Sequence, residues 1–232
     1  MKILAADTST SINTVAVCED DRVLAESIVE CGRSHSERLI GTVDWVLAEA
    51  GCRIEDMDAL AVSIGPGSFT GVRVGVATWK GLALGCKRPL APVPTLDAMT
   101  RLGAFRDGLV CPLLDARMGE VFGAVYHFRE GVRDKLVPDR VCPVEAILDE
   151  IDGGAIFLGN GAGLYRERIL ARNPGAVFAP AMCSVPRASA VACEARSLID
   201  RGVCTDPALV SPIYLRQSQA EINRARREAS SS

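Results

Sequence analysis

Short apolar runs alternate with polar turns along the first hundred residues of the chain. Runs that are apolar at most positions, or at every second position, predict β-strands, and they cover 2–6, 13–18, 22–30, 59–64 and 90–93. An apolar residue at every third or fourth position predicts a helix, and this spacing is found over 35–50, over 71–87 and from Thr95 onward. Ser34 and Glu37 have the spacing of a capping box at the start of the first helix.

The same pattern begins again in the second hundred residues. The predicted strands cover 109–114, 121–128, 135–141 and 155–158, and the predicted helices cover 144–151, 164–172 and 188–201, followed by an extended segment over 211–216. Asp7 and Asp115 each close an apolar strand, and each is followed ten residues later by a valine of the next strand. We interpret this repeat as a duplication, with a first half over 1–105 and a second half over 106–218. Residues 219–232 are polar and without apolar periodicity, which predicts a frayed or disordered tail.

Two halves that each open with a three-stranded meander and each contain a glycine-rich turn have the layout of actin-like ATPases and sugar kinases. The predicted fold class is therefore α/β, with duplicated mixed sheets flanked by helices in the actin-like (ASKHA) arrangement. In that layout a nucleotide lies in the cleft between the halves. Architecture alone does not give a function.

The helix predicted over 71–87 contains four glycines, each of which costs about 1 kcal/mol relative to alanine. One of its faces is mostly small, and such a face lets another backbone come close; it consists of Gly71, Gly75, Thr78, Leu82 and Gly85. A second face is bulkier and is predicted to pack on a sheet; it consists of Val72, Val76, Trp79, Ala83 and Cys86. The helix over 35–50 also has a second apolar side, made of Gly41, Trp45 and Ala48. We therefore predict that both helices contact another protein through their outward faces.

Two glycine-rich turns and two acidic corners are candidates for binding a nucleotide. Gly65 and Gly67 lie between a strand and a helix, where backbone N–H groups can hold an anion, although the turn fits neither the P-loop nor GxGxxG. A tight turn that brings the helix onto the sheet explains them equally well. Asp7 and Thr8 could face metal and phosphate or could simply satisfy their turn. In the second half, Gly159 and Gly161 are the corresponding candidates for nucleotide binding. Asp115 forms a second polar cluster with Arg117 and Glu120, and an Asp–Arg pair that fixes the turn is the commoner use of such residues.

The composition narrows the class of protein. With 232 residues, a formal charge of −3 and dispersed basic residues, the chain is not predicted to bind nucleic acid through charge alone. Its nine cysteines form no CxxC pair, which predicts reduced thiols in the cytoplasm. No apolar run approaches a signal peptide or the roughly 20 residues of a membrane span. His35 and His127 lie far apart in sequence, so no metal site is predicted, and Ser68 is not in a G-x-S-x-G elbow.

The segment GPGSFTGVRVG, with SHSERLI before it and PTLDAM after it, closely resembles the TsaB (YeaZ) family. The resemblance extends to DTST, LLDARMGEVF, GNGA and PIYLR, and so covers both halves. It implies an actin-like protein related to the Gcp/TsaD glycoprotease-like (M22) family. Members are non-catalytic partners of TsaD, which, together with the TsaE ATPase, forms threonylcarbamoyladenosine at position 37 of tRNAs reading ANN codons. The resemblance also implies a homodimer when TsaD is absent.

TsaD holds its metal with an HxxxH pair, and the shared valine before that motif places Thr95 and Met99 at the two histidine positions. Neither side chain is a ligand for a catalytic iron or zinc, which supports a subunit that is not catalytic alone. In the family, the two helices flanking the first sheet form the bundle with TsaD. No cofactor is required by this interpretation, but ATP or ADP with magnesium could bind at the partner interface. The alternative function is an independent actin-like ATPase or small-molecule kinase, and a metallopeptidase ranks third because the histidines are missing.

Overall fold

The computed structural model describes residues 1–31, 35–102, 107–203 and 206–216. Ser34 and the tail over 219–232 lie outside the described residues. The predicted capping box and the predicted state of the tail therefore stay predictions.

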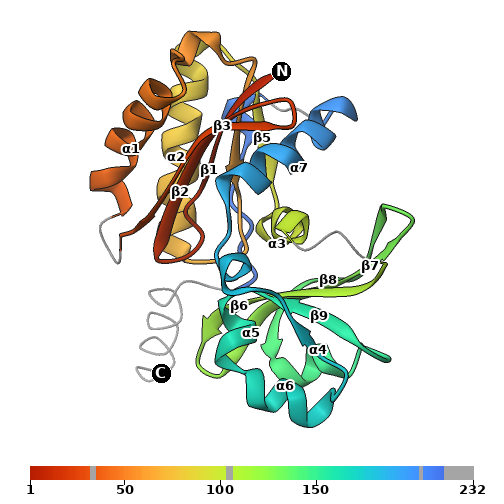
Figure 1. Ribbon diagram of the computed structural model, residues 1–232. Coiled ribbons are helices and arrows are strands. Elements are labelled where there is room, and N and C mark those ends of the chain that lie inside the picture. The colour runs from red at the N-terminus through yellow and green to blue at the C-terminus, as the bar shows by residue number, and fades with distance from the viewer. Residues whose placement is uncertain (32–34, 103–106, 204–205, 217–232) are drawn as a thin grey trace, which may run out of the picture.

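Two five-stranded mixed sheets organise the chain (Figure 1). The first has the order β3-β2-β1-β4-β5, with bounds β1 Lys2–Asp7, β2 Ile12–Glu19, β3 Arg22–Glu30, β4 Ala59–Ser63 and β5 Leu90–Val93. The meander β1-β2-β3 is antiparallel, whereas β1, β4 and β5 run parallel. All five elements were predicted to within one or two residues.

The second sheet repeats this topology. Its order is β8-β7-β6-β9-β10, with bounds β6 Gly108–Arg117, β7 Glu120–Arg129, β8 Val132–Pro143, β9 Ala155–Leu158 and β10 Val177–Phe178. Again the meander is antiparallel and the first, fourth and fifth strands are parallel. The matching order and directions confirm the predicted duplicated α/β fold class. The two-residue strand β10 was not predicted, because two residues are too few to carry a periodicity.

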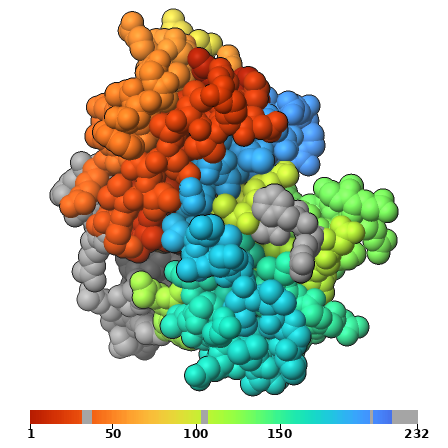
Figure 2. All heavy atoms as spheres, in the orientation of Figure 1, coloured from red at the N-terminus to blue at the C-terminus, as the bar shows by residue number. Residues whose placement is uncertain are grey.

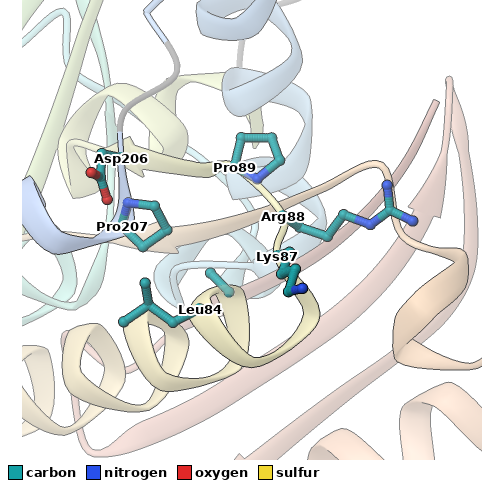
Figure 3. A pocket seen from close by; sticks show the side chains of 7 residues that line it. Leu84, Lys87, Arg88, Pro89, Asp206 and Pro207 are labelled. Carbon is teal, nitrogen blue, oxygen red and sulfur yellow. The ribbon is translucent and has the colours of Figure 1, made fainter.

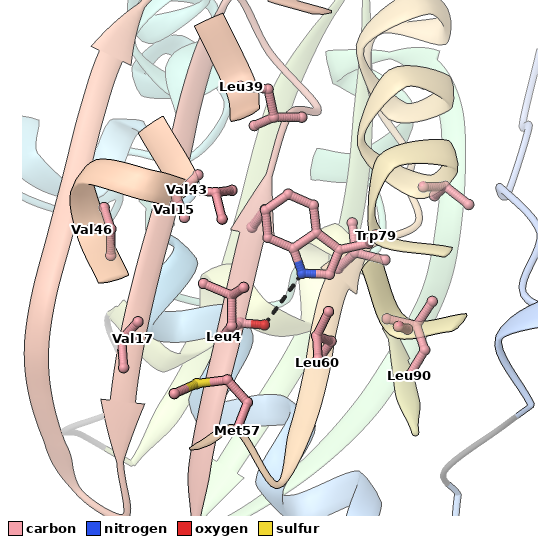
Figure 4. Close-up of a cluster of buried hydrophobic side chains, with 14 of the residues drawn as sticks. Leu4, Val15, Val17, Leu39, Val43, Val46, Met57, Leu60, Trp79 and Leu90 are labelled. Atoms are coloured by element: carbon pink, nitrogen blue, oxygen red, sulfur yellow. Dashed lines mark hydrogen bonds between the residues drawn. The ribbon is translucent and has the colours of Figure 1, made fainter. Parts of the chain in front are cut away.

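Helices α1 (His35–Glu49) and α2 (Phe69–Cys86) cover one face of the first sheet (Figure 1). The predicted sheet-facing residues of α2 are buried in this layer, namely Val72, Val76, Trp79 and Ala83. Figure 4 shows Trp79 at the centre of the cluster, where its indole N–H donates to the carbonyl oxygen of Leu4 at 3.2 Å. The helix is thereby fixed to the central strand of the sheet by both packing and a buried hydrogen bond.

Helix α7 (Ala188–Asp200) covers the opposite face of the first sheet. We predicted that this helix would complete the second half, and that prediction is wrong. The helix packs here because its side chains and those on this face of the sheet are both small. They are Ala5, Ala16, Ala61 and Ala91 of the sheet and Ala188, Ala192 and Ala195 of α7. The segment leading into α7 lies at the junction of the two halves (Figure 2).

The second sheet is covered on one face by α4 (Val144–Leu148) and α6 (Arg166–Arg172). Its other face packs on α3 (Thr95–Met99), which therefore lies between the two sheets. The helix predicted over 164–172 is α6, which begins at Arg166. The separate short helix α5 (Asn160–Leu164) was not predicted, because its residues form most of the glycine-rich turn. The remaining elements are short 3-10 helices, η1 Ile54–Asp56, η2 Thr100–Leu102, η3 Ala181–Ser184 and η4 Pro207–Leu209.

Candidate functional site

The first glycine-rich turn packs directly on the corner that follows β1. The backbone N–H of Ser68 donates to the carbonyl oxygen of Ser9 at 2.6 Å. A Cβ on Gly67 would overlap that oxygen and lie 2.6 Å from the Ser9 Cβ, and a Cβ on Gly71 would overlap the Thr8 carbonyl oxygen. The close approach of two backbones therefore accounts for these glycines.

Thr8 also contacts the first two turns of α2. Its hydroxyl donates to the carbonyl oxygen of Gly71 at 2.7 Å. A Cβ on Gly75 would overlap the same hydroxyl and lie 3.4 Å from the Thr8 Cβ. Gly71 and Gly75 are buried in this contact, so the prediction that they belong to an outward face is wrong. The backbone that approaches them is that of the same chain.

The other residues of the predicted small face lie on α2 where its buried side meets its exposed side. Thr78 and Leu82 are half-buried, and Gly85 is exposed with nothing within 4 Å of a Cβ placed on it. The outward line of α2 runs one residue further round the helix than predicted, through Arg73, Ala77, Gly81, Leu84 and Gly85. Leu84 is 55% exposed. Small residues four positions apart in the sequence indicate this exposed side of α2. The buried glycines Gly71 and Gly75 have the same spacing, so the spacing alone does not tell the two sides apart.

Helix α1 presents the apolar side that its sequence predicted. Gly41, Trp45 and Ala48 are exposed, and 51% of Trp45 is accessible. Ile40 of the same helix is also exposed, at 47%. Since α1 and α2 lie in one layer on the same face of the sheet (Figure 1), their outward residues form a two-helix surface. We call it the outer helix face, and it comprises Ile40, Gly41, Trp45 and Ala48 of α1 with Arg73, Ala77, Gly81, Leu84 and Gly85 of α2.

The two acidic corners are held by their own turns. Asp7 is 1% exposed, and its Oδ1 accepts hydrogen bonds from the backbone N–H and the hydroxyl of Ser9, at 2.9 and 2.8 Å. Asp115 accepts the backbone N–H of Arg117 at 2.9 Å, and the guanidinium of Arg117 lies 3.5 Å from its other oxygen. Both carboxylates are thus fixed by groups two residues further along.

The second glycine-rich turn repeats the first. A Cβ on Gly159 would overlap the carbonyl oxygen of Leu113, and one on Gly161 would lie 3.0 Å from it. The backbone N–H of Asp115 donates to the Asn160 side chain at 3.0 Å. Each turn therefore lies against the end of the first strand of its half. The sequence-predicted residues fall into two equivalent corners, each packed by a glycine-rich turn.

The two positions that match the metal-binding pair of TsaD lie inside the fold. Thr95 is buried and its backbone N–H donates to the carbonyl oxygen of Gly65 at 2.8 Å. Met99 is also buried, and its methyl group lies 3.0 Å from a Cβ placed on Gly159. Among the described residues, no group of three or more His, Cys, Asp or Glu side chains could hold a metal ion. Helix α3 therefore contacts both glycine-rich turns, the first through a backbone hydrogen bond and the second through packing.

Comparison with known proteins assigns this arrangement to a family. The family model of TsaD, tRNA N6-adenosine threonylcarbamoyltransferase, matches residues 29–224. The tRNA threonylcarbamoyladenosine biosynthesis protein TsaB of Escherichia coli (strain K12) is 33% identical over 227 residues, which cover 95% of this chain and 96% of the relative. The chain belongs to the TsaB (YeaZ) family. The resemblance carried by the GPGSFTG motif is thus confirmed.

Further TsaB-family proteins agree with this assignment. TsaB of Bacillus subtilis (strain 168) is 34% identical over 172 residues, which cover 73% of this chain and 75% of the relative. YeaZ from Pseudomonas aeruginosa superposes with a TM-score of 0.78 at 31% identity, over 92% of this chain and 99% of that one. The ethanolamine utilization protein EutJ from Carboxydothermus hydrogenoformans has a TM-score of 0.54 at 12% identity, which shows a shared fold only.

The TsaB-family chain also has a groove at the carboxyl end of α2 (Figure 3). Its volume is about 420 Å³, and its walls are formed by Ala83, Leu84, Lys87, Arg88, Pro89, Asp206 and Pro207. Leu84 belongs to both the groove and the outer helix face, so that face ends in a concave surface. Within the described ranges, no helix has the length and apolar character needed to cross a lipid bilayer.

Proposed function

We propose that this TsaB-family protein is a non-catalytic scaffold and activator that binds TsaD through the outer helix face. With TsaE, the complex forms threonylcarbamoyladenosine at position 37 of tRNAs that read ANN codons. The protein reaches tRNA through the complex, in the cytoplasm, and pairs with a second copy of itself when TsaD is absent. The proposal rests on family membership and on one observation, the exposed apolar surface of two adjacent helices.

The exposed side chains give the surface its chemistry. Ile40, Trp45 and Leu84 are each about half exposed on two neighbouring helices. Large apolar side chains gathered on one face mark a contact surface more often than single exposed ones do. Trp is enriched among the residues that dominate binding energy. The small residues Ala77 and Gly81 between them let a partner helix come close.

The test is co-elution of the full chain with its cognate TsaD on a size-exclusion column. We expect Trp45→Asp to weaken binding by at least about 30-fold, which corresponds to a hot-spot loss of about 2 kcal/mol. Leu164→Asp is the matched control, because Leu164 is 60% exposed but lies on α5 of the second half. Light scattering without TsaD checks whether Trp45→Asp also abolishes the homodimer. Co-elution of the Trp45 variant at the level of the control would refute the proposal.

An independent ATPase or small-molecule kinase is the second candidate, and the observation that favours it is the pair of equivalent corners. Asp7 is the last residue of β1, and Asp115 lies two residues before the end of β6, the equivalent strand. The packing of the first glycine-rich turn on Thr8 and Ser9 weighs against a phosphate in that corner. Magnesium-dependent ATP turnover by the purified protein alone would support an independent enzyme. Turnover only in the presence of TsaD and TsaE would favour the scaffold.

A further inference from the structure

Among the described residues, two of the polar contact regions between the halves of the molecule lie toward opposite ends of β7. One involves Tyr126 and the neighbouring strand β8, and the other involves Glu120, where β7 begins. Six residues of extended strand separate the two positions, which is about 20 Å at 3.3 Å per residue. The halves are therefore tied along two edges rather than at one point.

The first region, which we call the hairpin cluster, centres on Glu194 of α7. This carboxylate is 1% exposed and accepts charged hydrogen bonds from Arg101 of η2 at 2.7 Å and from Arg133 of β8 at 2.7 and 3.1 Å. The Arg133 guanidinium also donates to the Asp97 carbonyl oxygen at 2.9 Å and to the Thr100 hydroxyl at 2.8 Å. A single second-half side chain is thus fixed to α3, η2 and α7 at once.

The hairpin cluster continues around the side chain of Asp97. Its carboxylate accepts the hydroxyl of Tyr126 and lies 2.7 Å from the ammonium of Lys135, which in turn lies 2.8 Å from Asp139. Burial, reinforced by the Asp97 charge, raises the pKa of Tyr126 above its ordinary range, so this hydroxyl stays a donor. Three cations face three carboxylates in the cluster as a whole. Separating them would leave buried charges without partners, which is far costlier than breaking an exposed pair.

The second region is the strap, residues 211–216, which begins against the residues around the first sheet and ends against those around the second sheet. The backbone N–H of Ile213 donates to the Ile64 carbonyl oxygen at 2.7 Å, beside Gly65. Tyr214 stacks on Phe69 with ring centroids 4.7 Å apart, and its hydroxyl accepts a hydrogen bond from Arg73 at 2.8 Å. These contacts hold the strap to the first glycine-rich turn and to the first turns of α2.

The far end of the strap reaches the second acidic corner. Arg216 donates to the carbonyl oxygen of Ala116 at 2.9 Å and forms an ion pair with Glu120. The two side chains of that pair are 26% and 29% exposed, so water reaches both of them and separating the pair costs less than uncovering an enclosed carboxylate such as Glu194. Leu215 adds partial packing against the core of the second half. The strap is therefore held to the second sheet by a weaker ion pair than those of the hairpin cluster, where the central carboxylate, that of Glu194, is buried.

We propose that the strap is a releasable latch and the hairpin cluster a fixed pivot, so that the two halves open along the edge that the strap closes. The asymmetry follows from burial: at the cluster, opening exposes Glu194, whose side chain is 1% exposed, whereas at the strap it exposes Arg216 and Glu120, whose side chains are already 26% and 29% exposed. Opening separates the two acidic corners, because the strap begins beside the first glycine-rich turn and ends beside Asp115. This inference does not depend on the docking proposal.

Hydrogen exchange of the full-length protein, followed by mass spectrometry, tests the latch. Arg216→Ala should speed exchange about fivefold in peptides covering the strap and the β6–β7 turn, the factor that corresponds to losing one partly exposed ion pair worth about 1 kcal/mol. Peptides covering α3 and α7 should exchange as in the parent protein, and the melting temperature should stay the same. Arg168→Ala is the matched control, since it breaks a surface pair with Glu145 inside the second half, and it should leave strap exchange unchanged.

A variant at the pivot separates the two roles. Arg133→Met removes the cation that connects β8 to Glu194 and should raise exchange in α3, in α7 and in the strap together, with a lower melting temperature. The proposal is overturned if Arg216→Ala leaves strap exchange at the parent rate. It is equally overturned if Arg216→Ala raises exchange in α7 as much as in the strap, or destabilises the whole protein, because the latch would then be part of the fold.

Discussion

Replacing Gly75 by alanine tests the inward role of the glycines in α2. In a helix interior the substitution alone contributes about 1 kcal/mol of stability. At this position the new methyl group overlaps the Thr8 hydroxyl, and overpacking of a closed contact costs about 1–3 kcal/mol. If Thr8 turns away, its hydrogen bond to Gly71 is lost, at a further cost of about 1 kcal/mol. The net expectation is a loss of about 1–3 kcal/mol in the free energy of unfolding.

Gly81→Ala is the matched control on the same helix. Nothing lies within 4 Å of a Cβ placed on Gly81, so we expect a gain of up to about 1 kcal/mol. Urea unfolding followed by circular dichroism gives both values from the midpoint and slope. A double variant with Thr8→Ala should recover part of the loss, since it removes the group that the methyl meets. If Gly75→Ala proved as stable as Gly81→Ala, the close contact with Thr8 would be refuted.

Three further substitutions follow from the described contacts. Trp79→Phe should cost about 2–4 kcal/mol, because it leaves a cavity and removes the hydrogen bond to Leu4; an unfolding midpoint equal to the parent's would contradict this. Glu194→Gln should cost about 3–5 kcal/mol in thermal or urea unfolding, because two arginines lose their buried partner, and a neutral result would show the cluster to be dispensable. Burial raises the pKa of Cys18 from 9.0 to about 12, so the folded state keeps a proton that the unfolded thiol releases above its own pKa. The stability linked to Cys18 is therefore complete below pH 9.0 and declines toward pH 12, by up to about 1.4 kcal/mol per pH unit. The difference in unfolding midpoint between the parent and Cys18→Ala should shrink between about pH 8 and about pH 10, and a constant difference would argue against the shift.

Periodicity predicted the parts of this fold that depend on one element alone. The strands are recognisable because each side chain's surroundings repeat every second residue, and the sheet-facing side of α2 because Val72, Val76 and Trp79 repeat at helical spacing. The exposed side of α1 was predictable for the same reason, since Trp45 lies opposite the residues that pack on the sheet.

What could not be predicted depends on which distant segment comes close. Gly71 and Gly75 look like a surface for another protein because the sequence does not say that the Thr8 corner lies over them. Helix α7 packs on alanines that come from four different strands of the first sheet, and no single stretch of sequence shows that these alanines form one surface. Arg216 and Glu120 are almost a hundred positions apart, and no local pattern connects them.

The hydrogen bond between Arg73 and Tyr214 makes two events thermodynamically dependent on each other. Arg73 belongs to the outer helix face, whereas Tyr214 belongs to the strap. A partner that engages Arg73 binds the strapped and the released forms with different affinities whenever it strengthens or replaces this bond. By reciprocity, any ligand or substitution that shifts the strap must change the partner's affinity by the same factor. Titrating one binding event while monitoring the other would measure that factor from either direction.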